Sequence, residues 1–83
     1  MIYLVTFSTT HHAMAADVLV ENQGNTRLVS LPPTISAGCG LSLLVEDSSV
    51  EEILKILKKE KIPYSNVYEK IGMQEYKKYG GEN

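Results

Sequence analysis

The order in which strand-like and helix-like segments follow one another constrains the fold of this chain most. Residues 2–7 are a run of β-branched and aromatic side chains that is apolar on both faces, as expected of a central strand. A hydroxyl at positions 8–10 can cap a helix over residues 10–23, which Gly24 would end. A second, less hydrophobic strand is expected over residues 26–31. The chain therefore opens as strand, helix and strand.

Two further strands flank a second helix in the rest of the chain. Residues 32–40 contain two prolines and a Gly-Cys-Gly sequence, which indicates a loop before a strand at residues 41–45. Residues 49–52, Ser-Val-Glu-Glu, match a capping box, and the helix that follows has apolar residues at i, i+3, i+4 and i+7. Pro63 would close this helix, and residues 64–71 are typical of a weak final strand.

The resulting order, β-α-β-β-α-β, favours an α+β class and a ferredoxin-like fold. In that fold a four-stranded antiparallel sheet, with strand order 4-1-3-2, carries two helices on one face. A chain of 83 residues has room for one domain, which we assign to residues 1–71. Residues 72–83 are expected to form a C-terminal tail that is partly helical or disordered.

This topology predicts that the Gly38-Cys39-Gly40 loop lies beside the start of the first helix. The first and third strands are antiparallel neighbours, so the end of one and the beginning of the other share a rim of the sheet. The first helix begins at that rim, and the second helix returns to it with Pro63 and Tyr64. We therefore expect Cys39 to lie near residues 8–12, although they are far apart in the sequence.

Charge and composition argue against several classes of partner. The formal net charge is -2 and Arg27 is the only arginine, which is unfavourable for binding nucleic acid. No segment approaches the ~20 apolar residues of a membrane span. Residues 2–7 are too short for a signal peptide and lack a basic lead. Because a lone cysteine cannot form an internal disulfide, we expect a cytoplasmic protein with no membrane partner.

Cys39 is the candidate functional residue. Its flanking glycines leave the sulfur uncrowded, and the free N–H groups of a nearby helix N-terminus would stabilise a thiolate. A protonated His11 or His12 would act in the same direction. The alternative is that Cys39 is a small buried hydrophobic residue, since free cysteine is among the most buried residue types. The Gly-Cys-Gly context after a proline-rich loop favours a functional thiol.

Other chemistries find little support. Adjacent histidines on a helix point about 100° apart, so His11 and His12 are poorly arranged to bind one metal, and no metal site is expected. The hydroxyls of residues 8–10 could bind an anion, but N-capping accounts for them without a ligand. The sequence has neither a Cys-x-x-Cys pair nor a phosphate-binding glycine motif. We expect no cofactor, and a carrier or binding protein is favoured over an enzyme.

Several motifs occur together in a fixed order. They are Tyr3-Leu4-Val5-Thr6-Phe7, Ser8-Thr9-Thr10-His11-His12-Ala13, Pro32-Pro33, Ile35-Ser36 and Cys39-Gly40-Leu41-Ser42-Leu43. This order resembles the selenium/sulfur (Se/S) carrier protein-like family of small bacterial proteins. The family pattern is a strand, a Thr-His-His-Ala helix start and a Pro-x-x-Ile-Ser loop that leads into Cys-Gly. The resemblance covers about residues 1–71, and the chain departs from it in Gly38 and in its tyrosine-rich tail.

The resemblance implies that Cys39 carries sulfur or selenium as a persulfide or selenopersulfide. A donor protein would load the thiol and an acceptor protein would unload it. His11 and His12 match the histidines of the family and would tune the thiol. The remaining candidates for thiol tuning or partner binding are Thr10, Ser36, Gly38 and Gly40.

Two other functions stay open. One is a small-molecule-binding regulatory domain of ferredoxin-like fold, in which two copies pair through sheet edges or helices. The other is a protein-interaction module in which Cys39 is inert. A homodimer is compatible with each of these functions, and both sulfur and selenium are compatible with the carrier.

Overall fold

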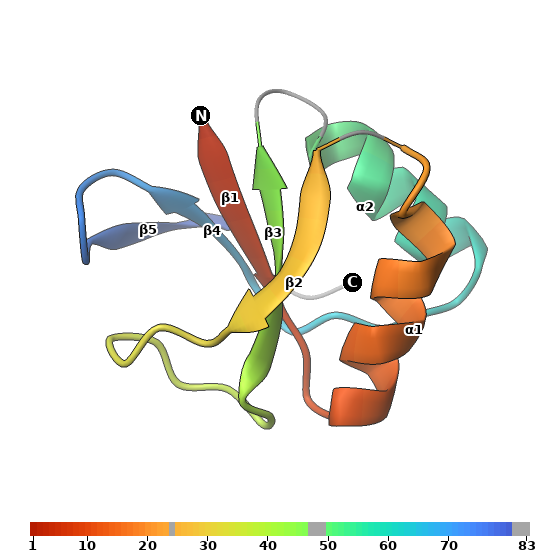
Figure 1. Ribbon diagram of the computed structural model, residues 1–83, viewed down its shortest axis with the longest axis horizontal. Helices are drawn as coiled ribbons and strands as arrows, with labels where there is room; N and C mark the ends of the chain where they lie inside the picture. Colours follow the sequence, from red (N-terminus) through yellow and green to blue (C-terminus); the bar gives the residue numbers. More distant parts are fainter. Residues whose placement is uncertain (24, 47–49, 81–83) are drawn as a thin grey trace.

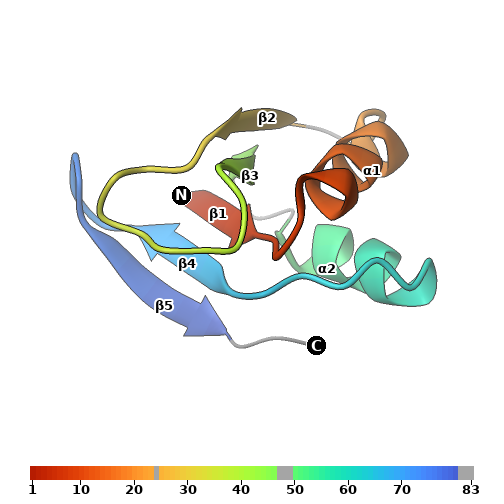
Figure 2. The same cartoon turned by 90° about the horizontal axis from the view of Figure 1, so that it is seen from below.

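The computed structural model describes residues 1–23, 25–46 and 50–80 of the chain. They form seven elements: β1 (Ile2–Thr6), α1 (Thr10–Val20), β2 (Thr26–Ser30), β3 (Leu41–Glu46), α2 (Val50–Lys59), β4 (Val67–Lys70) and β5 (Tyr76–Gly80). Neighbouring strands pair antiparallel in one sheet of order β2-β3-β1-β4-β5 (Figure 1). Both helices lie on the same side of this sheet (Figure 2). The prediction of an α+β domain with two helices on one face of an antiparallel sheet is confirmed.

The prediction of a four-stranded sheet is wrong. The first four strands keep the neighbours expected of a ferredoxin-like sheet, but β5 pairs with β4 and extends the sheet at that edge. Residues 76–80, predicted to be a helical or disordered tail, are therefore a strand. The reason is tertiary: the Tyr79 ring packs edge-on against Tyr3, with centroids 5.1 Å apart, and the Tyr79 hydroxyl donates a hydrogen bond to Glu51 of α2.

The two helices cover one face of the sheet through different kinds of residue. α1 presents small side chains, Ala13 and Ala16, which let it approach β2 and β3 closely. α2 has the amphipathic pattern expected for it, with Val50, Ile53 and Leu57 buried. Residues of the strands and of the segments next to them complete this core, namely Tyr3, Val5, Phe7, Leu43, Val45, Tyr64 and Val67. Two predicted caps, Gly24 for α1 and Ser49 for α2, lie outside the described residues.

The loop between β2 and β3 reaches the side of the sheet away from the helices before it returns to the rim (Figure 2). Ile35 of this loop is buried, yet it does not belong to the helix-side core. Leu4, which pairs with Tyr68 across β1 and β4, is likewise buried outside that core. The loop therefore packs against the face of the sheet opposite the helices and then returns to the helix side at Cys39.

Candidate functional site

The rim of the sheet joins three segments that are distant in sequence. The amide N–H of Ser65 donates to the carbonyl of Thr6 over 2.7 Å, and the Thr6 N–H donates to Asn66 over 2.9 Å. At the same rim the backbone of Gly38 lies against the backbone of Ser8. The predicted approach of the Gly38-Cys39-Gly40 loop to the start of the first helix is therefore confirmed at Gly38 and Ser8.

The contact between Gly38 and Ser8 requires a glycine. A Cβ atom at position 38 would stand 2.3 Å from the Ser8 carbonyl oxygen and 2.8 Å from the Ser8 Cα. The requirement comes from close approach of two backbones, which is one of the recurrent uses of glycine. Gly40 is different, because a Cβ atom there would meet no atom within 4 Å. One glycine thus anchors the loop, and the other leaves open space beside Cys39.

Cys39 is half-buried and packs against the edge of the helix-side core. Its Sγ donates a hydrogen bond to the carbonyl oxygen of Leu41 over 3.4 Å. The next residue, Gly40, accepts a hydrogen bond from the N–H of Leu31 over 2.9 Å, which closes the base of the loop. Cys39 is therefore linked to the backbone of Leu41 at the rim, and the residue as a whole is partly exposed to solvent.

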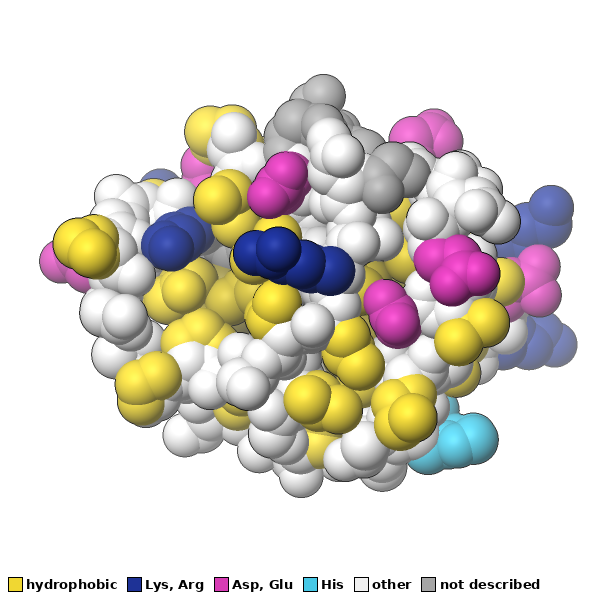
Figure 3. All heavy atoms as spheres, in the orientation of Figure 1, with side chains coloured by type: hydrophobic (Ala, Val, Ile, Leu, Met, Phe, Trp, Pro, Cys, Tyr) yellow, Lys and Arg dark blue, Asp and Glu magenta, His cyan; other side chains and the backbone are white. Residues whose placement is uncertain are grey.

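The start of α1 is organised by Thr9, one of the three hydroxyl residues expected to cap it. Thr9 has extended backbone angles, and its Oγ1 accepts a hydrogen bond from the N–H of His12 over 3.1 Å. The same Oγ1 lies 3.0 Å from Nδ1 of the His12 ring, so the capping hydroxyl also contacts the imidazole of His12. His11 and Thr10 are exposed, and the two imidazole centroids are 5.8 Å apart. Figure 3 shows the histidines at the lower right, where α1 begins.

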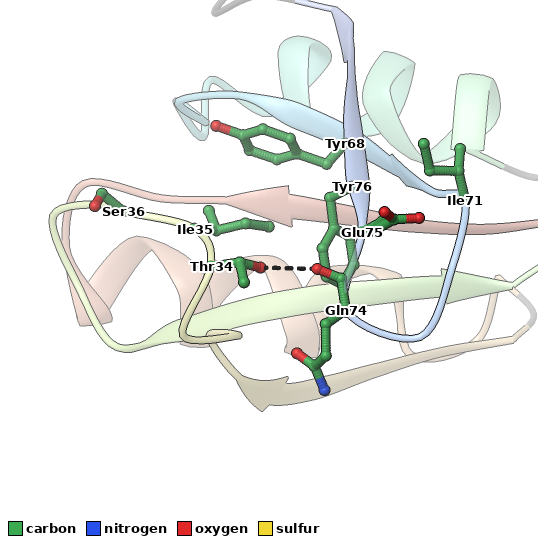
Figure 4. Close-up of a pocket in the computed structure, with 8 residues that line it drawn as sticks. All are labelled: Thr34, Ile35, Ser36, Tyr68, Ile71, Gln74, Glu75 and Tyr76. Carbon is green, nitrogen blue, oxygen red and sulfur yellow. Dashed lines mark hydrogen bonds between the residues drawn. The ribbon is translucent and has the colours of Figure 1, made fainter.

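Ser36 lies apart from this cluster. It lines a groove of about 510 Å³ between the β2–β3 loop and the β4–β5 hairpin, on the sheet face away from the helices. The hydroxyl of Thr34 donates to the carbonyl of Gln74 over 3.3 Å and bridges the two sides (Figure 4). The remaining lining residues are Ile35, Tyr68, Ile71, Glu75 and Tyr76. This groove was not predicted from the sequence because it depends on β5, which the residue pattern did not reveal. The aromatic residues Tyr76 and Tyr79, which favour strands, were the available signal.

Glu51, in the first turn of α2, contributes to the raised pKa of two tyrosines. Its carboxylate accepts the hydrogen bond from Tyr79, and this bond raises the pKa of that phenol, with lesser contributions from burial and from the charge of Glu51. The pKa of Tyr64 is also raised, first by burial and then by the Glu51 charge. Both phenols are therefore held in their protonated form more firmly than a free tyrosine.

Within residues 1–23, 25–46 and 50–80, no group of three or more His, Cys, Asp or Glu side chains is arranged to hold a metal ion. Nor does this part contain a helix long and apolar enough to cross a membrane.

Comparison with known proteins relates the rim to a family. A family model described as "Putative Se/S carrier protein-like" matches residues 2–69, which run from β1 into β4 and include Cys39, His11 and His12. No curated protein and no solved structure gave a match. The matched segment is more than half of the chain and agrees with the extent of the resemblance seen in the sequence. The chain belongs to the Se/S carrier protein-like family.

Proposed function

We propose that this protein carries sulfur or selenium on Cys39 and moves it between a donor and an acceptor protein. The observation that carries the proposal is the position of the thiol: Cys39 is the only cysteine, half-exposed at a rim beside the start of α1, in a member of a family named for Se/S carriage. A reduced thiol is the form that accepts cargo, and the cytoplasm is the compartment that maintains it.

Loading is a thiol–persulfide exchange. The Cys39 thiolate attacks the terminal sulfur of a donor persulfide, R–S–SH, the S–S bond of the donor breaks, and the products are Cys39–S–SH and the donor thiolate R–S⁻. A selenopersulfide, R–S–SeH, transfers selenium in the same way. Unloading repeats the step with an acceptor thiolate, which takes the outer atom and returns Cys39 to its thiolate. No net oxidation or reduction accompanies either transfer, so the carrier needs no cofactor.

The other candidate residues have distinct proposed roles. Gly38 holds the loop against Ser8, and the open space at Gly40 admits the sulfur of a partner. His11 and His12, at the first turn of α1, are proposed to take the thiol proton, and the exposed Thr10 is proposed to contact a partner. Ser36 lies on the groove side of the loop, so we assign it to partner binding rather than to thiol tuning.

The direct test is to load the protein from a cysteine desulfurase supplied with L-cysteine and to measure its intact mass. We expect an increase of one sulfur atom in the wild type and none in Cys39→Ser, because the variant lacks the only thiol. Loading from a small-molecule persulfide serves as a second donor. A wild-type protein that gains no chalcogen from either donor would refute the carrier function.

A regulatory domain that binds a small molecule is the second candidate, and the groove lined by Tyr68 and Tyr76 favours it. A hollow of about 510 Å³, with a lining that is about equally polar and apolar, is in the size range of small-ligand sites. A ligand there would raise the melting temperature equally in the wild type and in Cys39→Ser, because the groove does not include Cys39. A rise that requires Cys39 would argue against this candidate.

A further inference from the structure

The contact between Thr9 and His12 can be made with either group as the hydrogen donor. Thr9 Oγ1 accepts the backbone N–H of His12 over 3.1 Å and lies 3.0 Å from Nδ1 of the His12 ring. A hydroxyl has one hydrogen to donate and two lone pairs that accept, so it can donate to a bare Nδ1 or accept from an Nδ1–H. In a neutral imidazole one nitrogen carries the hydrogen, so the direction of this bond fixes the tautomer of His12.

The start of α1 favours Thr9 as the donor. The N–H groups of the first helical turn have no partner within the helix, and together they give this end a partial positive charge. Because Nδ1 lies against the capping residue, a bare lone pair is stabilised there, and the first turn has no acidic side chain that would favour an N–H instead. The hydroxyl hydrogen of Thr9 also has no other acceptor among residues 1–23, 25–46 and 50–80.

We propose that Thr9 is a positioning residue that fixes His12 as the tautomer with its hydrogen on Nε2 and a bare Nδ1. One oxygen then has two tasks, because it caps α1 and also sets the hydrogen-bonding role of the imidazole. His12 offers an N–H, which binds an anionic group such as a thiolate or a persulfide, whereas its Nδ1 is already occupied by the Thr9 hydroxyl. The part of His12 in carriage rests on the proposed function, and there it leaves uptake of the thiol proton to His11.

His11 supplies a comparison within the same helical turn. Its ring lies beside that of His12, with centroids 5.8 Å apart, and the residue is exposed to solvent. Within the part of the chain that the structure describes, neither of its ring nitrogens has a hydrogen-bond partner. The two imidazoles therefore share the field of the helix terminus, but the capping hydroxyl contacts the ring of His12. A change at Thr9 should alter the tautomer of His12 and leave that of His11 as it is.

The tautomer can be measured by NMR from the nitrogen chemical shifts of each imidazole at about pH 8.5, above the usual histidine pKa of about 6.5. We expect a bare Nδ1 and a protonated Nε2 for His12 in the wild type and in Thr9→Ser, which keeps the hydroxyl. Thr9→Asp is the matched variant, because aspartate also caps helices but its carboxylate only accepts hydrogen bonds. It should move the hydrogen of His12 to Nδ1. A protonated Nδ1 in the wild type, or an unchanged His12 tautomer in Thr9→Asp, would overturn the proposal.

A loading assay tests what the tautomer does in carriage. The backbone of Gly38, next to Cys39, lies against Ser8, next to Thr9, so the cap adjoins the loop that holds the thiol. With glutathione persulfide as the donor, Thr9→Ser should load at the wild-type rate and Thr9→Asp about tenfold or more slowly.

The same substitution in a His12→Ala background separates the tautomer from the charge of the new carboxylate. Thr9→Asp should have no further effect there, because the imidazole that it acts on is gone. An equal slowing in both backgrounds would overturn the role of His12 in carriage. A wild-type protein that does not load would refute the carrier function, whereas the tautomer is measured without cargo and stands or falls on the NMR result.

Discussion

Replacement of Gly38 by alanine tests the contact that holds the Cys39 loop at the rim. The added Cβ would stand 2.3 Å from the Ser8 carbonyl oxygen, 2.8 Å from the Ser8 Cα and 2.9 Å from the Ser8 carbonyl carbon. All three are backbone atoms between β1 and the Thr9 cap, so they cannot rotate aside as the end of a side chain would. The loop and the start of α1 must therefore separate.

The expected loss follows from the size of this clash. Ordinary contact begins at 3.4 Å, so the two segments must move apart by about 1 Å. Overpacking of this kind lowers the free energy of unfolding by about 1–3 kcal/mol. For a domain of this length each kcal/mol corresponds to roughly 4–8 °C, so Tm should fall by roughly 4–24 °C.

The flanking glycine supplies the control. A Cβ at position 40 meets no atom within 4 Å, so Gly40→Ala should change the free energy of unfolding by no more than about 0.5 kcal/mol. Urea unfolding followed by circular dichroism measures both variants. Iodoacetamide labelling of Cys39 under native conditions adds a local readout, and it should be faster in Gly38→Ala because the loop no longer rests on Ser8.

Two outcomes would refute this reasoning. Equal unfolding free energies for Gly38→Ala and Gly40→Ala would mean that the loop shifts without any loss of stability and that Ser8 does not anchor it. A destabilised Gly38→Ala protein that labels no faster than the wild type would mean that the contact supports the fold but does not position Cys39.

Two further predictions concern the hydroxyls of the structure. Thr6 Oγ1 accepts from the N–H of Asn66 over 3.1 Å and donates to its carbonyl, whereas buried Ser42 Oγ has no hydrogen-bond partner among the described residues. Thr6→Val should therefore lower the free energy of unfolding by about 1–3 kcal/mol in urea titrations, whereas Ser42→Ala should leave it unchanged or raise it. Equal losses in the two variants would contradict the hydrogen bonds assigned to Thr6. The raised pKa of Tyr79 means that the folded state holds the phenol protonated above the usual 10.0, so its stabilisation is present below pH 10.0 and is lost as pH rises through the folded value. Between about pH 8 and about pH 11 the urea midpoint should therefore fall less for Tyr79→Phe than for the wild type. An identical fall in the two proteins would count against the Tyr79–Glu51 hydrogen bond.

The sequence predicted the rim because the signals there are local and the topology follows from their order. A hydroxyl cap before an alanine-rich helix, and a Gly-Cys-Gly loop before an apolar strand, each indicate an element boundary. Once the first and third strands are neighbours, Ser8 and Gly38 must lie at the same end of the sheet. This backbone contact could therefore be predicted from the strand order alone, without knowledge of individual side chains.

The rest depended on tertiary contacts that local patterns do not encode. The lysines of Tyr76–Gly80 weaken its strand signal, and the strand is held by the ring of Tyr3 and the carboxylate of Glu51, which are remote in sequence. Ser36, a candidate for thiol tuning or partner binding, lines the groove, whereas Cys39 packs against the helix-side core. A motif read along the sequence does not show which face of the sheet each loop residue reaches.

The hydrogen bond from Cys39 to Leu41 exists only while the sulfur bears a hydrogen. Any group that replaces this hydrogen, whether an alkyl label or a chalcogen atom, removes the donor and detaches the side chain from the Leu41 carbonyl. An empty and an occupied protein would thus differ in how tightly the residue is tethered, without any change in the fold. The thiolate lacks this hydrogen as well, so the side chain is fastened to Leu41 only in the neutral thiol and is released when the sulfur loses its proton to react.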